Sequence, residues 1–239
     1  MKVVFVGPTV PDARKLAGAA FAVRPPAMQG DILRAIRAGG TVIGLVDGNF
    51  EHVAPVWHKE ILFALSQGVQ IFGAASMGAL RAAECASFGM IGVGEIFRRY
   101  AAGELADDSD VALLHAPAEL GYAPLTVPLV NVHATLARLR QSGSITAGDA
   151  ARIEAAARQI FYKRRTWAAI VADADLQTDG DRAALAARLH QGLVDQKRVD
   201  ALELFEMVRA QPDELRGGRP NWEFNSTSMW KVLLNQPQT

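Results

Sequence analysis

Three short apolar runs, separated by segments of helical periodicity, constrain the fold of this chain more than any other feature. The runs lie at residues 3–7, 41–47 and 69–73. Each is the length of a buried strand, and strands that alternate with helices form right-handed βαβ units with parallel strands. A fourth strand is expected at residues 110–115, another short apolar run. The sequence therefore predicts an α/β fold, a Rossmann-like or flavodoxin-like parallel sheet with flanking helices.

The remaining segments are predicted to be helical. Crossover helices are expected at residues 29–38 and 56–66, each followed by glycine. After about residue 125 no further clear strand follows, and helices are expected at residues 131–141, 146–161, 182–189 and 195–210. We expect an α/β domain at residues 1–125 and an all-helical extension at residues 126–239. The aromatic residues Trp222, Phe224 and Trp230 either fold back onto the core, which we favour, or bind a partner.

The third strand turns abruptly into a helix, with a serine at the junction. Residues 69–84 read VQIFGAASMGALRAAE, and Ser76 lies where small residues give way to helix formers. The pattern around it differs from the G-x-S-x-G nucleophile elbow by Ala74 at the first glycine position. Ser76 is therefore either a nucleophile beside the amides at the helix N-terminus or an ordinary helix cap.

A nucleophilic serine needs a base, and two candidates precede it. His58 and Lys59 begin the helix before the third strand, so either could reach the carboxyl ends of the strands. Asp47, at the end of the second strand, could orient His58 to give a triad with Ser76. A pairing of Ser76 with Lys59 is the competing arrangement, since burial lowers the pKa of a lysine. His115 would end the fourth strand, as a proton-transfer group or a hydrogen-bonded histidine.

Arg81 and Glu84 are three residues apart on the helix after Ser76, and thus neighbours on one face. They form either a structural ion pair or part of a substrate site in which Arg81 holds a carboxylate or thiocarboxylate. The acidic residues Asp107, Asp108 and Asp110 are read as a solvated turn with capping carboxylates, or as a Mg²⁺ site.

Composition excludes several classes of function. The 25 basic and 25 acidic residues give zero net charge, so nothing favours nucleic acid or a membrane surface. The single cysteine, Cys85, excludes an intrachain disulfide and a cysteine-based zinc site, which fits a cytoplasmic protein, and it is expected to be a buried hydrophobe. No phosphate-binding glycine motif follows the first strand and no apolar stretch is long enough to span a bilayer. We expect neither a cofactor nor a metal.

Several unusual sequence motifs, occurring in one order, make the chain similar to the TfuA-like family. They are PPAMQGDI, VWHKEI and FGAASMGALRAAE, followed by DDSDVALLHAP and LVNVH, and with the opening MKVVFVGPTV the resemblance covers roughly the first 135 residues. It implies sulfur incorporation into ribosomally made peptides beside a YcaO-type enzyme, which converts a backbone amide into a thioamide. Any use of ATP would then belong to the YcaO-type enzyme.

Two functions from different classes follow from this resemblance. In the first, the chain is a serine-type hydrolase of a thiocarboxylated ubiquitin-like sulfur-carrier protein. Ser76 attacks, the first helix residues Met77 and Gly78 contact the substrate and stabilise the oxyanion, and sulfide is released. In the second, the chain is a non-catalytic adaptor that recruits or activates the YcaO-type enzyme, with the precursor peptide as a further candidate partner.

Overall fold

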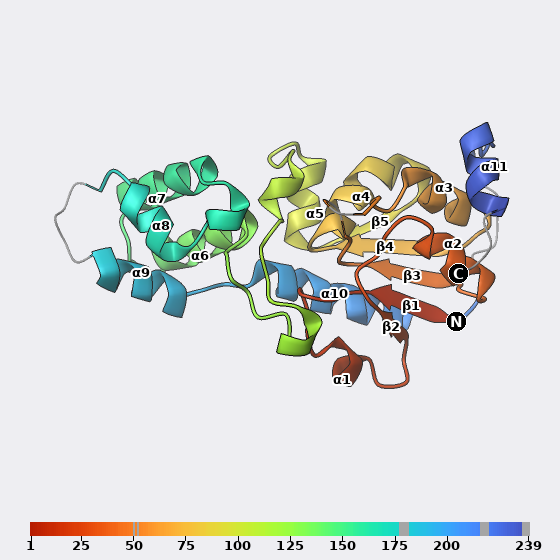
Figure 1. Ribbon diagram of the computed structural model, residues 1–239, viewed down its shortest axis with the longest axis horizontal. Helices are drawn as coiled ribbons and strands as arrows, with labels where there is room; N and C mark the ends of the chain where they lie inside the picture. Colours follow the sequence, from red (N-terminus) through yellow and green to blue (C-terminus); the bar gives the residue numbers. More distant parts are fainter. Residues whose placement is uncertain (50, 52, 177–181, 216–219, 236–239) are drawn as a thin grey trace. The chain divides into compact units, whose positions relative to one another are not determined.

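The computed structural model describes residues 1–49, 51, 53–176, 182–215 and 220–235. The chain divides into two compact units, which are described separately below (Figure 1). The first comprises Met1–Glu104 and Arg198–Thr239, and the second comprises Leu105–Lys197. The expected division into domains at residue 125 stays a prediction, since compactness alone does not show where an independently folding domain ends.

The first unit is built on a parallel sheet, which confirms the predicted fold class. Its strands are β1 (Lys2–Phe5), β2 (Ala22–Arg24), β3 (Val42–Leu45), β4 (Gln70–Ala74) and β5 (Ile91–Val93). Their order is β2-β1-β3-β4-β5 and every pairing is parallel, the order of flavodoxin-like sheets. The three apolar runs form β1, β3 and β4 as predicted, whereas β2 and β5 were not expected.

The strand expected at residues 110–115 is wrong. The 3₁₀ turn η2 (Asp108–Asp110) lies at its start, and His115 forms only an isolated antiparallel bridge with Pro124. The run is apolar because Val111 and Ala112 are buried in the second unit, which does not require a strand.

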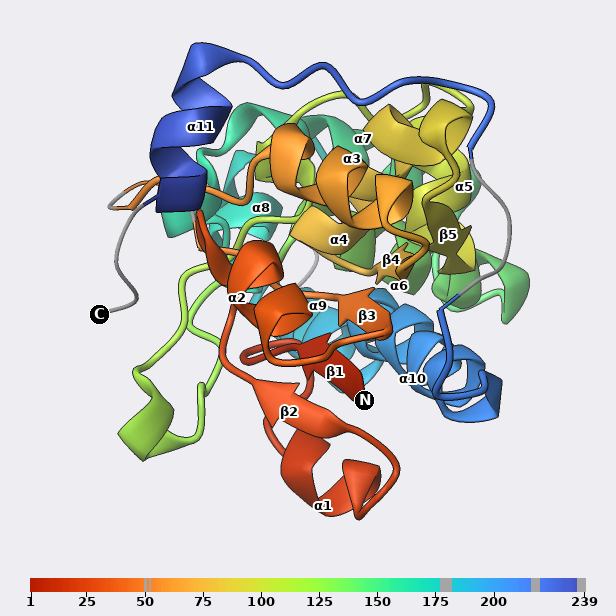
Figure 2. The same cartoon turned by 90° about the vertical axis from the view of Figure 1, so that its right-hand side faces the viewer.

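Helices cover both faces of the sheet. They are α1 (Ala13–Ala17), α2 (Asp31–Arg37), α3 (His58–Ser66), α4 (Met77–Cys85), α5 (Gly94–Ala101), α10 (Gln196–Ala210) and α11 (Ser228–Asn235), with the short η1 (Ala86–Phe88) after α4. Adjacent strand residues point to opposite faces, so Ile71 packs with α2, α3 and α4 while Phe72 packs with α1 and α10. Figure 2 shows α3 and α4 on one side of the sheet and α10 on the other.

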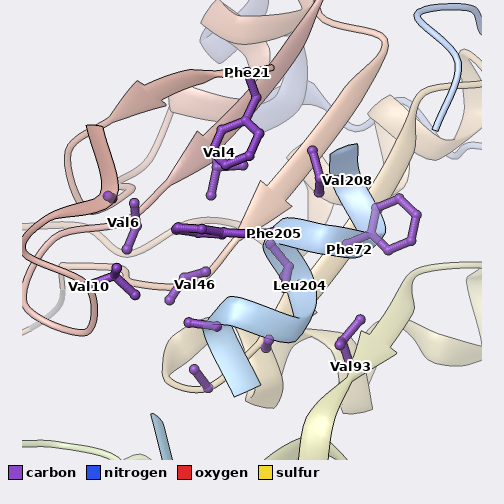
Figure 3. Packing of buried hydrophobic residues seen from close by; sticks show 14 of the residues in the cluster. Val4, Val6, Val10, Phe21, Val46, Phe72, Val93, Leu204, Phe205 and Val208 are labelled. Atoms are coloured by element: carbon purple, nitrogen blue, oxygen red, sulfur yellow. The ribbon is translucent and has the colours of Figure 1, made fainter. Parts of the chain in front are cut away.

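Helix α10 completes the core of the first unit although it comes from the far end of the sequence. Leu204, Phe205 and Val208 are at most 1% exposed and pack against Val4 and Phe72 of the sheet (Figure 3). Helix α10 thus belongs to the first unit and covers one face of its sheet.

The C-terminal aromatic residues fold back onto the first unit, as favoured from the sequence. Trp222 donates a hydrogen bond from Nε1 to the carbonyl of Phe88, at 3.1 Å. Trp230 is 1% exposed, and its ring centroid lies 5.0 Å from that of Phe63 in α3. Residues 220–235, here called the C-terminal segment, thus lie against α3 and η1.

The second unit is helical. Its helices are α6 (Leu129–Gln141), α7 (Ala147–Gln159), α8 (Trp167–Asp173) and α9 (Arg182–Gln191), with 3₁₀ turns η2, η3 (Ala118–Leu120) and η4 (Tyr162–Arg164). Apolar side chains of all four helices form one core. The helices expected at residues 131–141, 146–161 and 182–189 are confirmed within a few residues, and α8 is additional. Within the described ranges, no helix is both long and apolar enough to cross a membrane.

Candidate functional site

The candidate residues of the first unit gather at the carboxyl edge of the sheet. Phe5, Leu45 and Gly73 pair across β1, β3 and β4, so the segments that follow these strands leave the sheet at one edge. They carry Thr9, Asp47 and Ser76. In open parallel sheets this edge is where ligands bind.

Asp47 stabilises the loop after β1. It is 2% exposed, and its carboxylate accepts hydrogen bonds from the Gly7 and Thr9 amides, at 2.8 and 3.0 Å, and from the Thr9 hydroxyl, at 2.6 Å. The structure does not bring Asp47 and His58 together, because both carboxylate oxygens of Asp47 accept from this loop and His58 faces another carboxylate. Thr9 is the partner of Asp47.

Ser76 follows a strained turn. Ala75 is fully buried and has a φ of 66°, and the Ser76 amide donates to the carbonyl of Ala74 at 2.8 Å. This is a γ-turn with positive φ at its central residue, a conformation that is rare and strained. The strain falls on the residue before the serine, whereas the nucleophile elbow places the serine itself on the strained turn.

The Ser76 hydroxyl does not cap α4. Ser76 occupies the N-cap position, but its side chain makes no capping hydrogen bond. Among the described residues the hydroxyl has no hydrogen-bond partner, and the residue is partly exposed. The cap reading of Ser76 therefore fails, and a free hydroxyl lies at the start of a helix.

The amides that open α4 are not all available to a ligand. Gly78 donates to the carbonyl of Val46 at 3.1 Å, and Ala79 donates to the carbonyl of Ser76 at 3.0 Å. The Met77 amide is left without a partner in the described part of the chain. Because it follows Ser76 directly, it has the position of the oxyanion-hole amide in nucleophile elbows.

Gly78 brings α4 against the sheet. A Cβ atom on Gly78 would lie 1.8 Å from the carbonyl oxygen of Leu45, so only glycine fits. On the other side, the Met77 side chain packs over Gly48, where a Cβ would lie 2.9 Å from Met77 Cγ. Gly78 thus positions the turn rather than contacting a ligand through its amide.

His58, Arg81 and Glu84 form a cluster between α3 and α4. His58 Nε2 and Arg81 Nη1 lie 2.7 and 2.6 Å from the same oxygen, Glu84 Oε2. Arg81 also donates from Nε to the carbonyl of Val56, at 3.2 Å. The expected Arg81–Glu84 pair is confirmed, and it has gained a partner that local spacing could not indicate, because His58 is 26 residues from Glu84.

Lys59 faces away from this cluster, toward the C-terminal segment. Its Nζ donates to the carbonyl of Asn225 at 2.6 Å and lies 4.9 Å from the ring centroid of Phe224. Both contacts hold a charged ammonium, so the arrangement does not favour Lys59 as a base.

The other candidates have ordinary local roles. His115 belongs to the second unit, where Nδ1 lies 2.8 Å from the carbonyl of Ala116 and the ring packs edge-on against Tyr122; it does not end a strand of the sheet. Asp107 accepts from the Ser109 amide at 2.8 Å, which lowers its pKa, and Asp110 accepts from the Asp107 amide at 3.3 Å. These contacts confirm the capping-turn reading of the acidic cluster.

Cys85 has the surroundings expected of a buried hydrophobe. It is 1% exposed, and burial raises the pKa of its thiol from 9.0 to about 11. It therefore lacks the thiolate character of a reactive cysteine.

Comparison with known protein families identifies a match. A family model described as TfuA-like protein matches residues 47–166, half of the chain. The matched stretch contains His58, Ser76, Arg81 and Glu84; it omits residues 1–46, which the resemblance was expected to include, and extends past residue 135. No curated protein sequence matches the chain.

Proposed function

Because the chain belongs to the TfuA-like protein family, we propose that it supplies sulfur for backbone thioamidation of a ribosomally made peptide beside a YcaO-type enzyme. In this proposal it hydrolyses a thiocarboxylated ubiquitin-like sulfur-carrier protein at Ser76 and releases sulfide. Family membership supports an association with YcaO-type modification at a general level. The hydrolysis rests on the site.

The observation that carries the hydrolysis is the state of Ser76. Its hydroxyl has no partner among the described residues, follows a strained buried turn and precedes the available Met77 amide. A serine that served only as a helix cap would use its hydroxyl to accept from the first turn. A nucleophile needs a free hydroxyl and an adjacent donor for the developing oxyanion, and both are present.

The reaction consists of two steps. Ser76 Oγ attacks the thiocarboxylate carbon, and the C–S bond breaks with its electron pair remaining on sulfur. The serine proton passes through a base to this sulfur, which leaves as hydrosulfide. Water then cleaves the resulting ester, giving a carboxylate and restoring the serine hydroxyl, so that the net reaction is hydrolysis of a thiocarboxylate to a carboxylate and hydrogen sulfide.

His58 is the base in this proposal. Asp47 and Lys59 are left out of the chemistry, because the first secures the loop after β1 and the second is bound to the C-terminal segment. No hydrogen bond joins His58 to Ser76 in the described structure, so proton transfer requires the ring to approach when substrate binds, or a water to bridge. Such contacts often tighten only in the complex with substrate.

The test is sulfide release from a purified thiocarboxylated carrier protein. Ser76→Ala is expected to reduce release by about 100-fold or more, since it removes the nucleophile. Ser87→Ala, at an exposed serine one helix turn after α4, is the matched control and should release sulfide at the wild-type rate. Unchanged release by a folded Ser76→Ala variant would contradict the hydrolase.

A second function, the non-catalytic adaptor, is favoured by one specific observation: His58 and Lys59 both have partners other than Ser76. Free sulfide separates the two functions. If the chain only releases sulfide, excess sulfide should allow the YcaO-type enzyme to form the thioamide without it. If the chain is an adaptor, thioamide formation should still need it at any sulfide concentration, and Ser76→Ala should act like the wild type.

A further inference from the structure

We infer that Glu84 is the carboxylate that positions His58, the role that we predicted for Asp47 from the sequence. This inference rests on the proposed function, because it assigns a positioning residue to the base of the proposed hydrolysis. It goes beyond that function in naming which carboxylate acts, from which helix, and which ring nitrogen of His58 is left for chemistry.

The geometry places the His58 ring against Glu84. Nε2 lies 2.7 Å from Glu84 Oε2, the length of a charge-assisted hydrogen bond. Both side chains are exposed to solvent, 48% for His58 and 36% for Glu84. The contact joins the first residue of α3 to the last turn of α4, so it links His58 to the helix that follows Ser76.

Arg81 holds Glu84 in place. Its side chain is 12% exposed, donates from Nη1 to Glu84 Oε2 at 2.6 Å, and is itself fixed by Nε to the carbonyl of Val56 at 3.2 Å. A carboxylate that is held by a largely buried guanidinium orients the ring better than one on a mobile side chain, because less side-chain conformational entropy is lost when it binds the ring.

The contact determines which nitrogen can act as the base. A carboxylate only accepts hydrogen bonds, so the nitrogen that faces it, Nε2, carries the proton. In the neutral ring the lone pair is then on Nδ1, and Nδ1 is the atom that accepts the Ser76 proton. As in other activated serines, a third group fixes the tautomer and orientation of the base, but the two ring nitrogens exchange roles relative to the serine-protease triad, where the carboxylate binds Nδ1 and Nε2 is the base.

The hydrogen bonds of Asp47 exclude it as the carboxylate that positions His58. Its carboxylate accepts three hydrogen bonds from Gly7 and Thr9 and is 2% exposed. Turning it toward His58 would leave two buried amides and a hydroxyl without partners, which is unfavourable because buried polar groups need a hydrogen-bond partner.

The test compares two glutamates that each pair with an arginine three residues away on a helix. Glu84→Gln changes the proposed positioning residue, and Glu95→Gln changes the equivalent pair on α5, where the described structure pairs Glu95 with Arg98. With sulfide release from the thiocarboxylated carrier, Glu84→Gln is expected to lower kcat by about 10- to 100-fold with KM within about threefold, while Glu95→Gln changes neither. Glu84→Asp, which keeps the charge, should recover part of the lost kcat.

A double-mutant cycle with His58→Ala separates positioning from a structural ion pair. If Glu84 acts through His58, Glu84→Gln should have no further effect on kcat in the His58→Ala background. Independent effects of the two substitutions, or a Glu84→Gln variant that behaves like Glu95→Gln, would overturn the inference.

The Ser76→Ala variant, measured in the same assay, distinguishes failure of the positioning role from failure of the proposed hydrolase. If Ser76→Ala loses release and Glu84→Gln does not, the hydrolase stands and the positioning role is refuted. If Ser76→Ala retains release, the proposed function fails, and the positioning role falls with it.

Discussion

The lack of a side chain at Gly78 allows the γ-turn at Ala75, which precedes Ser76, to form. The close approach of α4 to Leu45 involves a backbone oxygen, which cannot move aside as a flexible side chain could. The strained γ-turn at Ala75 is held in place by this contact and by the buried surroundings of Ala75.

Gly78→Ala is expected to destabilise the protein by about 3 kcal/mol, because the added methyl group forces α4 away from β3. Gly148→Ala is the control: it lies in α7 with a negative φ, and its Cβ would meet only Arg152 and Thr146 side-chain atoms, at 3.3 Å or more. That change should stabilise by up to about 1 kcal/mol, since alanine favours helix. Urea denaturation measures both, and equal effects would contradict the close-contact argument.

Cys85 gives a second prediction at this scale. With its pKa raised to about 11, the thiol of the folded protein carries about 100-fold less thiolate at pH 8 than a cysteine with a pKa of 9.0. Alkylation by iodoacetamide at pH 8 should therefore be at least about 100-fold slower in the native than in the urea-unfolded protein, and Cys85→Ala should release sulfide normally. Rapid native labelling, or loss of release in a folded Cys85→Ala variant, would point to sulfur chemistry at the thiol.

Residue roles could be predicted where they depend on neighbours in the sequence. The burial of Cys85 among alanines and the pairing of Arg81 with Glu84 follow from helix spacing alone. The pairing of Asp47 with Thr9 and that of His58 with Glu84 join residues that are 38 and 26 positions apart, and they depend on strand order, which local spacing does not contain. The triad of Asp47 and His58 failed for that reason.

At the scale of elements, Glu60 links two helices. It is fully buried in the first turn of α3, and its carboxylate accepts from the amides of Gly30 and Leu33 at the start of α2, at 2.8 and 3.4 Å, and from Trp57. Burial raises the pKa of this carboxyl above 4.5, although the three amides oppose the shift.

This pKa shift predicts a pH-dependent stability. The folded state holds the Glu60 proton more tightly than the unfolded chain, so unfolding releases a proton at pH values just above 4.5. The contribution of Glu60 to the free energy of unfolding therefore falls as the pH rises through this window, and it is largest below 4.5. Relative to Glu60→Gln, the wild type should lose stability as the pH rises above 4.5, as urea denaturation at several pH values will show. The opposite slope would mean that the amides outweigh burial.

Elements with strong local signals were predictable and short ones were not. Strands β1, β3 and β4 are continuous apolar runs, because both of their faces are covered. Strands β2 and β5 have three residues each and are partly exposed, so their sequences carry little signal. The apolar residues at 110–115 were read as a strand because a short buried run has no periodicity that separates strand from loop.

For the whole molecule, the main result is that the first unit needs both ends of the chain. Burial of side chains such as Leu204, Phe205 and Val208 stabilises by about 1.5–3 kcal/mol each, and a domain's net stability is only about 5–15 kcal/mol. Removing α10 would therefore cost a burial free energy comparable with the whole net stability of the domain. Amphipathic periodicity predicted α10 as a helix, but not that it packs on a sheet formed by residues far away in the sequence.

A chain that ends at residue 125 is accordingly expected not to fold, because Val4, Val46 and Phe72 would lose their cover. A chain in which a short glycine–serine linker replaces residues 105–197 should retain the sheet, since it keeps residues 198–210 of α10 and the hydrogen bond from the Ile96 amide to Asp200, at 2.8 Å. Circular dichroism and urea denaturation measure both. A cooperative transition in the chain that ends at 125 would instead support the domain division expected from the sequence.

The late position of α10 also has a consequence for biosynthesis. The ribosome makes the sheet first, then the roughly ninety residues of the second unit, and only then the helix that covers the sheet. At roughly 5–20 residues per second, the nascent sheet waits about 5–20 s with one apolar face uncovered. The newly made chain is thus most exposed to aggregation, and most in need of a chaperone, while residues 105–197 are being translated.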